Sequence, residues 1–210
     1  SPLENNEIQS PFEDPNDNSN FHHYIEGLVS RGWSDHAIQS IEESTRKIMN
    51  FLFDPSIDGQ FQRYGLVVGR VQSGKTANYA GLISRAVDAG YDIIIVLAGL
   101  HNSLRKQTQI RLQNEIISSS NTSTRRRLIP LTQEDVDYQT LPSPHIFSAS
   151  REKSVLLVVK KNVTPLTKLY HQLRELDPME TLGLNLLVVD DEADHATING
   201  QKIDPHGVEE

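Results

Sequence analysis

A glycine-rich segment between an apolar run and a helical run is the feature that most restricts what this chain can fold into. The run 65–69 is short and apolar, as in a β-strand, and 76–89 has the apolar spacing of a helix that ends at Gly90. Between the two, the chain reads Gly69-Arg70-Val71-Gln72-Ser73-Gly74-Lys75-Thr76. This order predicts a strand, a tight loop, and a helix that begins where the loop ends.

Strands and helices continue to alternate after this segment. Apolar runs predict strands at 91–98, 145–148, 154–159 and 184–190, and helical periodicity predicts helices at 103–117 and 164–176. The polar stretch 118–137 is expected to be a loop or an insertion. The alternation predicts an α/β fold with a central, mostly parallel sheet and right-handed crossovers.

The residues before this region have a different character. Residues 1–20 are rich in Asn, Pro, Ser, Asp and Glu and are expected to form a flexible lead-in. Residues 21–53 have helical periodicity, and Ser34 or Asp35 is placed to cap a second helix. The sequence therefore predicts three parts: the lead-in 1–20, a small helical appendage at 21–58, and the main lobe at 59–210.

Composition excludes several classes of site. The chain has no cysteine, so disulfides, cysteine-based zinc sites and cysteine nucleophiles are excluded. We find neither a secretory signal nor an apolar stretch long enough to span a membrane, and we expect a cytoplasmic protein. The net charge is −8, yet residues 61–130 carry 10 basic and 3 acidic side chains, so the middle of the chain can present a basic face.

The glycine-rich segment has the pattern of a phosphate-binding loop. Gly69 and Gly74 allow the backbone to wrap around phosphate oxygens, and the N–H groups at a helix start favour an anion. Lys75 would reach the β- and γ-phosphates and Thr76 would be a magnesium ligand. The position between a strand and a helix favours phosphate binding over an ordinary glycine turn. All eight residues are candidates to bind ATP with Mg²⁺: Gly69, Arg70, Val71, Gln72, Ser73, Gly74, Lys75 and Thr76.

A cluster of carboxylates follows the last predicted strand, which ends in Asp190-Asp191-Glu192-Ala193-Asp194. If this strand lies close to the phosphate loop, one carboxylate can meet the magnesium ion and the next can orient or deprotonate the attacking water. We assign Asp191 to the metal and Glu192 to the water; the alternative register puts Asp190 on the metal. The competing interpretation is a helix start decorated with acids. The catalytic candidates are Lys75, Asp191 and Glu192.

These segments resemble a known group of proteins. Gly74-Lys75-Thr76 and Asp191-Glu192-Ala193-Asp194 match motifs I and II of superfamily-two helicases and translocases, although the DEAD-box members usually have glycine at the position of Gln72. With Ala98-Gly99-Leu100, they resemble the Z-one domain family of bacterial restriction and defence clusters, often found beside nuclease domains. The resemblance implies a three-layer RecA-like lobe, hydrolysis of ATP, DNA handling, and a second RecA-like lobe that carries an arginine finger.

Further residues are candidates for contacts within such a lobe. In the resembling helicases, a glutamine upstream of motif I reads adenine, and Gln62 is the candidate here. The helix after the second predicted strand lies where such proteins grip a nucleic-acid backbone, which makes Arg105, Lys106 and Arg111 candidates for phosphate contacts. A solvated helix face explains the same three bases equally well. His101 and His195 fit no zinc spacing.

Two functions of different classes remain open. The first is the ATP-hydrolysing lobe of a helicase-like DNA translocase or remodelling enzyme of a restriction or defence system. The second is an ATP-dependent switch or assembly module that binds protein partners without translocation. The basic middle segment favours the first function, and the acidic helical front of the chain leaves room for the second. A small-molecule phosphotransferase fits the carboxylate cluster less well, because that cluster suits water activation.

Overall fold

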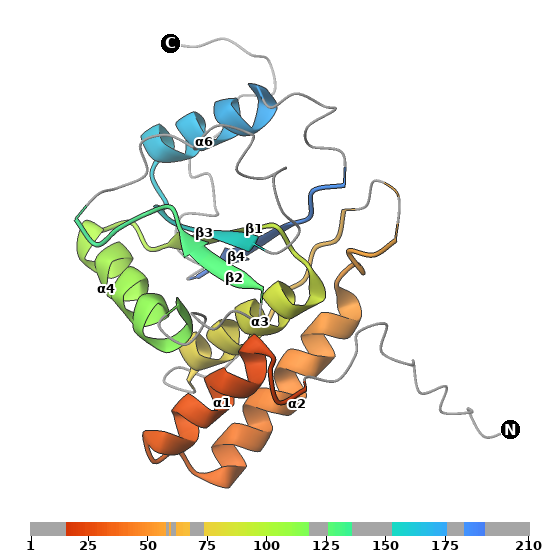
Figure 1. Cartoon of the computed structure of the whole chain (residues 1–210). Coiled ribbons are helices and arrows are strands. Elements are labelled where there is room, and N and C mark those ends of the chain that lie inside the picture. The colour runs from red at the N-terminus through yellow and green to blue at the C-terminus, as the bar shows by residue number, and fades with distance from the viewer. Residues whose placement is uncertain are drawn as a thin grey trace, which may run out of the picture.

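In the part of the chain that the structure describes, the central sheet has four parallel strands in the order β2-β3-β1-β4 (Figure 1). The computed structural model describes residues 16–57, 59, 62–67, 74–117, 126–135, 153–175 and 183–191. Within these ranges the strands are β1 (Ile93–Ala98), β2 (Arg127–Pro130), β3 (Lys153–Lys160) and β4 (Leu186–Asp190). The α/β fold with a parallel sheet is therefore confirmed.

Helices cover both faces of this sheet. Figure 1 shows α6 on one face, α3 and α4 on the other, and α1 and α2 packed outside α3. A π-helical turn, η1, continues α4. The bounds are α1 (Asn20–Ser30), α2 (Asp35–Phe51), α3 (Lys75–Ala89), α4 (Asn102–Leu112), η1 (Gln113–Ile117) and α6 (Val163–Glu175). None of the helices in these described ranges is long and apolar enough to cross a membrane.

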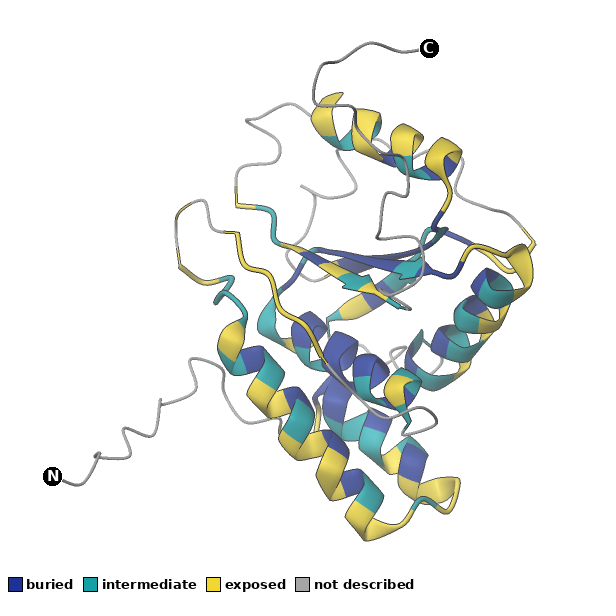
Figure 2. Cartoon of the chain, turned by 180° about the vertical axis from the view of Figure 1, so that it is seen from behind, coloured by how far each residue is buried: buried dark blue, intermediate teal, exposed yellow. Residues whose placement is uncertain are grey.

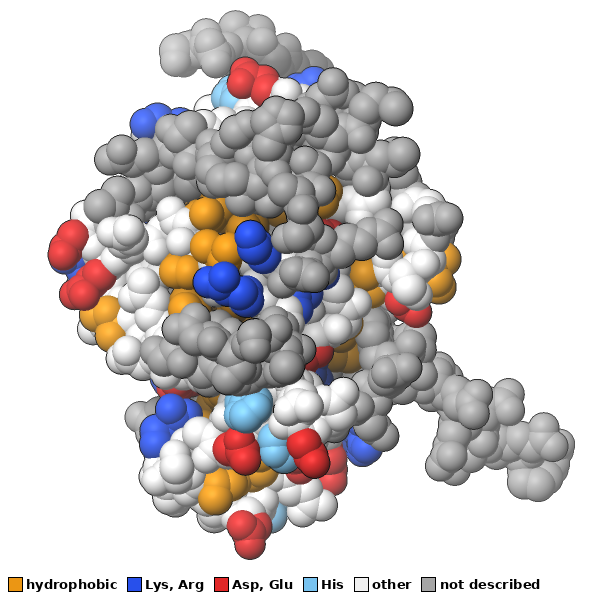
Figure 3. Space-filling model, in the orientation of Figure 1, with side chains coloured by type: hydrophobic (Ala, Val, Ile, Leu, Met, Phe, Trp, Pro, Cys, Tyr) orange, Lys and Arg blue, Asp and Glu red, His pale blue; other side chains and the backbone are white. Residues whose placement is uncertain are grey.

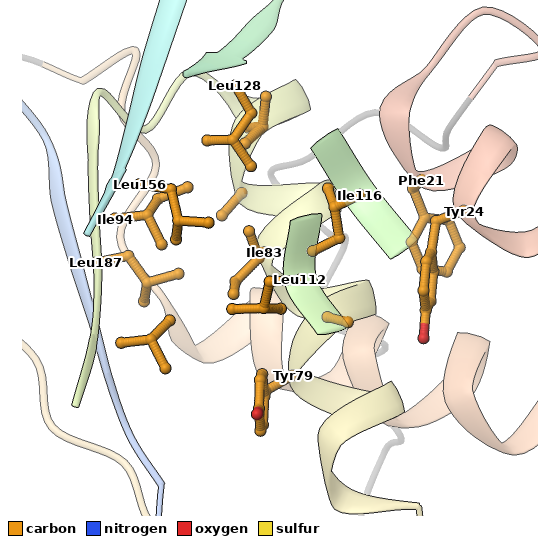
Figure 4. Packing of buried hydrophobic residues seen from close by; sticks show 14 of the residues in the cluster. Phe21, Tyr24, Tyr79, Ile83, Ile94, Leu112, Ile116, Leu128, Leu156 and Leu187 are labelled. Atoms are coloured by element: carbon orange, nitrogen blue, oxygen red, sulfur yellow. The ribbon is translucent and has the colours of Figure 1, made fainter. Parts of the chain in front are cut away.

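The larger core lies between the sheet and α3. Ile94 of β1 is aligned with Leu156 of β3 and Leu187 of β4, and all three side chains are buried against this helix layer. Figure 4 shows Ile83 of α3 and Leu112 of α4 packed beside them. Burying each such side chain stabilises the fold by about 1.5–3 kcal/mol. The core thus fixes α3, the helix that follows the glycine-rich segment, against the sheet.

The opposite face of the sheet is covered over only part of its width. Ile95 and Leu157 point to this side because strand side chains alternate, and Leu169 of α6 packs on them. On β4 the same face carries Leu186 and Val188, which are 44% and 49% exposed. Figure 2 shows the largely buried sheet between helices whose outer sides are exposed. The α6 layer therefore covers β1 and β3 and leaves β4 partly open.

The helical pair α1–α2 packs tightly on α3. A Cβ atom built on Gly81 of α3 would lie 3.2 Å from side-chain atoms of Ile41 and Tyr24 and 3.3 Å from Phe21, so the absence of a side chain permits this approach. The Tyr24 hydroxyl also donates a 2.7 Å hydrogen bond to the carbonyl of Ala77. One continuous core cluster joins α1, α2, α3 and β1. The predicted boundary between residues 58 and 59 stays a prediction.

A polar network ties together the amino ends of the strands. Arg126 donates to Asp92 Oδ1 at 2.6 Å and to the Ser154 hydroxyl at 2.7 Å, and Asp92 Oδ2 accepts from the backbone N–H of Asn185 at 2.8 Å. The Arg126 and Asp92 side chains are each only 13% exposed. The network joins the starts of β1, β2, β3 and β4, which are far apart in the sequence.

Two predicted elements need correction. Residues 65–67 form no strand, and Leu66 and Val67 are 79% and 61% exposed. Inside the stretch predicted to be a loop lies β2, the edge strand that pairs with β3 from Arg127 opposite Lys153 onward. The predicted helices and the strands β1, β3 and β4 are confirmed. The helix predicted at 103–117 is α4 followed by η1. The predicted strand at 145–148 and residues 1–15 lie outside the described residues.

Candidate functional site

The start of α3 has an open helix N-terminus. Gly74, the residue before the helix, has a φ of 72°, a left-handed conformation that glycine adopts without strain. Within the described chain, no side chain caps the first turn, so its N–H groups stay available. The Lys75 side chain is exposed and Thr76 is partly buried. The preceding loop residues, Gly69, Arg70, Val71, Gln72 and Ser73, lie outside the described residues.

Trp33 supports this turn from the helical pair. A Cβ atom on Gly74 would lie 3.8 Å from the edge of the indole ring. The Trp33 ring packs against the main core cluster and follows α1 directly. The turn before α3 therefore rests on the α1–α2 connection, a contact that the sequence alone did not indicate.

The end of β4 carries the carboxylates predicted for the site. Asp190 pairs with the ammonium group of Lys161, which is 7% exposed at the end of β3. Asp191 follows the strand, and its backbone N–H donates a 3.0 Å bond to the carbonyl of Leu97. The pairing of Asp190 with a buried lysine favours Asp191 over Asp190 as a metal ligand. Glu192 and Asp194 lie outside the described residues.

Tyr79 connects the start of α3 with the end of β4. Its hydroxyl donates a 3.3 Å hydrogen bond to Asp191 Oδ2. Burial raises the pKa of Tyr79 above its ordinary value, and the nearby charge of Asp191 raises the pKa further. The side chains of Thr76 and Thr108 interact with the same hydroxyl and act in the opposite direction on this pKa. Asp191, one of the two predicted magnesium ligands, thus contacts a phenol that stands three residues after the other, Thr76, on α3.

The donors at this site fit a magnesium nucleotide better than a metal held by protein alone. Thr76 and Asp191 offer a hydroxyl and a carboxylate, which are oxygen ligands of the kind Mg²⁺ takes. The described residues contain no group of three or more His, Cys, Asp or Glu side chains that could hold a metal ion. A magnesium ion bound here would depend on phosphate oxygens and water for its remaining ligands.

One basic residue predicted to contact nucleic acid does not face solvent. Arg105 is 2% exposed, and its guanidinium donates to the backbone carbonyls of Gln133 at 3.1 Å and Glu134 at 2.5 Å. The physical reason is that α4 presents this position to the segment after β2, whose carbonyl groups need donors. In this structure the Arg105 guanidinium is therefore buried against backbone carbonyls, and a phosphate contact at Arg105 stays a prediction.

The other two predicted contacts are paired with acids. Lys106 pairs with Asp135, and this interaction lowers the pKa of the Asp135 carboxyl. Arg111 donates to Glu115 at 3.0 Å, one turn along the helix. On the face shown in Figure 3, Lys and Arg side chains gather over the middle of the molecule, with Asp, Glu and His side chains below them. DNA binding through Lys106 and Arg111 stays a prediction.

Two smaller candidates lie on the surface. Gln62 is exposed, and its side-chain amide donates to the hydroxyl of Tyr64, which is itself 89% exposed. Among the described residues, no hydrogen bond joins either side chain to α3, so an adenine contact at Gln62 stays a prediction. His101 is exposed directly before α4, and His195 lies outside the described residues.

The sequence predicts Lys75, Thr76 and Asp191 as site residues, which stays a prediction, and it gives no sign of the contacts that Tyr79 and Lys161 make. Tyr79 occupies a position that the helical pattern already explains as core, and its ring is indeed 9% exposed. Its spacing of three residues from Thr76 puts both side chains on one helix face, and this spacing is the signal that could have found it.

Comparisons with protein-family models, curated proteins and solved structures returned no match.

Proposed function

We propose that this chain binds ATP with Mg²⁺ and hydrolyses it, as the RecA-like lobe of a helicase-like DNA translocase or remodelling ATPase of a restriction or defence system. The observation that carries the proposal is the hydrogen bond between Tyr79 and Asp191. It joins the helix that starts at Lys75 to the strand end that carries the carboxylates. The arrangement supports the pairing of a phosphate loop with an acidic strand end that the sequence predicts.

Each residue has a distinct part in the proposed reaction. The N–H groups at the start of α3 and the Lys75 ammonium bind phosphate oxygens. Thr76 and Asp191 hold the magnesium ion, which neutralises charge on the phosphates. Glu192 orients the attacking water. An arginine finger from a second lobe would supply about three to five orders of magnitude in rate.

Calorimetric titration of the chain with ATP and Mg²⁺ tests the proposal. We expect saturable binding that Lys75→Ala weakens by about tenfold or more, because a hydrogen bond to a charged group contributes about 1.5–3 kcal/mol. Lys168→Ala, at an exposed lysine of α6, is the matched control and is expected to bind like the wild type. Equal affinity in Lys75→Ala and Lys168→Ala would contradict the proposal.

The surroundings of the three basic side chains on α4 favour the second candidate function, an ATP-dependent switch or assembly module. Of the three bases predicted to grip DNA, Arg105 is buried and Lys106 and Arg111 have acidic partners. Measuring ATP hydrolysis with and without double- and single-stranded DNA separates the two candidates. A translocase is stimulated by DNA, and DNA affinity falls steeply with salt. A rate unchanged by both DNAs favours the switch.

A further inference from the structure

The phenol of Tyr79 lies between the two residues proposed to hold magnesium. Tyr79 stands one helical turn after Thr76 on α3, and its hydroxyl donates to Asp191 Oδ2 at 3.3 Å. Thr76 and Tyr79 are three residues apart on α3, so their side chains share one helix face. A single O–H group therefore contacts the candidate ligand at the strand end and lies on the same helix face as the other.

The core holds this phenol in place. The Tyr79 ring is 9% exposed, and Figure 4 shows it below Leu112 and Ile83, at the edge of the packed cluster. A side chain packed in this way has little freedom to change rotamer, so its hydroxyl is a fixed donor. By comparison, Asp191 directly follows the last residue of β4 and is only partly buried.

The hydrogen bond also determines which oxygen of Asp191 is left for a ligand. Oδ2 accepts from Tyr79, while Oδ1 accepts no hydrogen bond from the described residues. The backbone of Asp191 is held separately, by the bond from its N–H to the carbonyl of Leu97. The side chain is thus oriented by Tyr79 and the main chain by β1.

We propose that Tyr79 is a positioning residue for the magnesium nucleotide: its hydroxyl holds the Asp191 carboxylate, next to Thr76, in the orientation that binds the metal ion. This inference rests on the proposed function and adds a residue to it. Partners that orient metal ligands typically contribute a factor of about 10 to 100 in metal affinity. Tyr79 touches neither the metal nor the phosphates in this proposal and acts through Asp191 and Thr76.

The test is Tyr79→Phe, which removes the hydroxyl and keeps the ring. Titrating Mg²⁺ into the chain with a fluorescent ATP analogue measures the apparent Mg²⁺ affinity, and the same analogue in EDTA measures nucleotide binding without metal. We expect Tyr79→Phe to weaken the apparent Mg²⁺ affinity by on the order of tenfold, with binding in EDTA unchanged. Tyr91→Phe is the matched control, because Tyr91 is also a buried phenol and donates at 2.6 Å to the carbonyl of Phe53, away from the site.

A double-mutant cycle separates positioning from a general loss of packing. If Tyr79 acts through Asp191, Tyr79→Phe has little further effect on Mg²⁺ affinity in an Asp191→Ala background, where the phenol has no side-chain acceptor left to orient. Additive effects of the two substitutions would overturn the proposal. So would Tyr79→Phe with the Mg²⁺ affinity of the wild type. If Tyr79→Phe does not fold, Thr76→Ala and Asp191→Ala still report whether these ligands hold the metal, and wild-type Mg²⁺ affinity in both would overturn it.

The failure of this inference and the failure of the proposed function give different results. A wild-type chain that binds no ATP with Mg²⁺ rejects both. A wild-type chain that binds it and depends on Lys75, but not on the Tyr79 hydroxyl, rejects only the positioning role.

Discussion

The two ends of α3 lie beside carboxylates that have very different surroundings. At its carboxyl end, Asp88 accepts three hydrogen bonds from the start of α1: two from Asn20, at 2.8 and 2.7 Å, and one from the Phe21 N–H at 2.9 Å. At its amino end, the Asp191 carboxylate accepts one hydrogen bond from the described residues, the 3.3 Å bond from Tyr79. About 20 Å of helix separates the two ends.

The difference distinguishes carboxylates that stabilise the fold from one that can bind a ligand. Asp88 caps α1, and Asp92 close by receives the Arg126 guanidinium and a backbone N–H. Oxygens occupied in this way have little capacity for a metal ion. Asp191 keeps one oxygen without a partner among the described residues, beside an uncapped helix start and the exposed Lys75. This contrast puts the candidate site at the carboxyl edge of the sheet.

The largest effect is expected at the amino edge, from Asp92→Ala. Removing this carboxylate breaks its ion pair with the Arg126 guanidinium, in which both side chains are 13% exposed. Breaking such a pair costs about 3–5 kcal/mol. Urea unfolding measures the loss, and Glu42→Ala at an exposed position of α2 is the control. A loss as small as that of the control would show that the edge is not held by this pair.

Asp191→Asn should have the opposite profile. We expect the rate of ATP hydrolysis to fall by on the order of a hundredfold, since even indirect partners of a metal are worth 10–100-fold. The free energy of unfolding should change little, because the asparagine oxygen can still accept from Tyr79. A steady-state phosphate assay and urea unfolding check both parts. If the substitution unfolds the chain and leaves the specific rate intact, Asp191 belongs with the structural carboxylates.

Asp88→Ala is expected to have an intermediate effect on stability. It removes the acceptor for the first N–H groups of α1, and loss of a helix cap costs about 0.5–2 kcal/mol. Thermal unfolding followed by circular dichroism measures the change, and calorimetry measures ATP binding. We expect a lower Tm with unchanged affinity for ATP. Weaker ATP binding at a temperature where the variant is still folded would mean that the two ends of α3 are coupled.

The smallest effect is expected from Lys106→Ala. The Lys106 side chain is 41% exposed, and exposed ion pairs contribute little to stability. Its neighbour Arg105 provides the contrast, because Arg105→Ala would leave the carbonyls of Gln133 and Glu134 without their donor. Thermal unfolding should give the wild-type Tm for Lys106→Ala and a clearly lower Tm for Arg105→Ala. Equal changes in Tm for the two variants would contradict the inference that the buried side chain stabilises the fold more than the exposed one.

Elements with a strong pattern could be predicted from the sequence, and elements set by distant contacts could not. The strands β1 and β3 are continuous apolar runs, and α3 ends at Gly90 in a left-handed turn with a φ of 101°. In contrast, β2 is a four-residue edge strand that begins at Arg127 and ends in Pro130, and it lies within a polar stretch. The composition of β2 does not predict a strand, and β2 is a strand because it pairs with β3.

The same limit applies to the candidate site. Lys75, Thr76 and Asp191 stand in local patterns whose chemistry is specific, so the sequence identifies them. The contact of Tyr79 with Asp191 spans 112 residues and depends on how α3 packs on β4. The burial of Arg105 likewise depends on the segment after β2, which no local pattern connects to α4.

Hydrogen exchange with and without ATP and Mg²⁺ tests the central claim most directly, because it compares the two edges in one sample. The account predicts slower amide exchange in peptides that contain residues 74–79 and 190–191, and unchanged exchange in peptides that contain residues 88–92 and 126–128. The Lys75→Ala chain should lose this protection. Protection confined to the amino edge, or equal exchange with and without the nucleotide at a saturating concentration, would contradict the account.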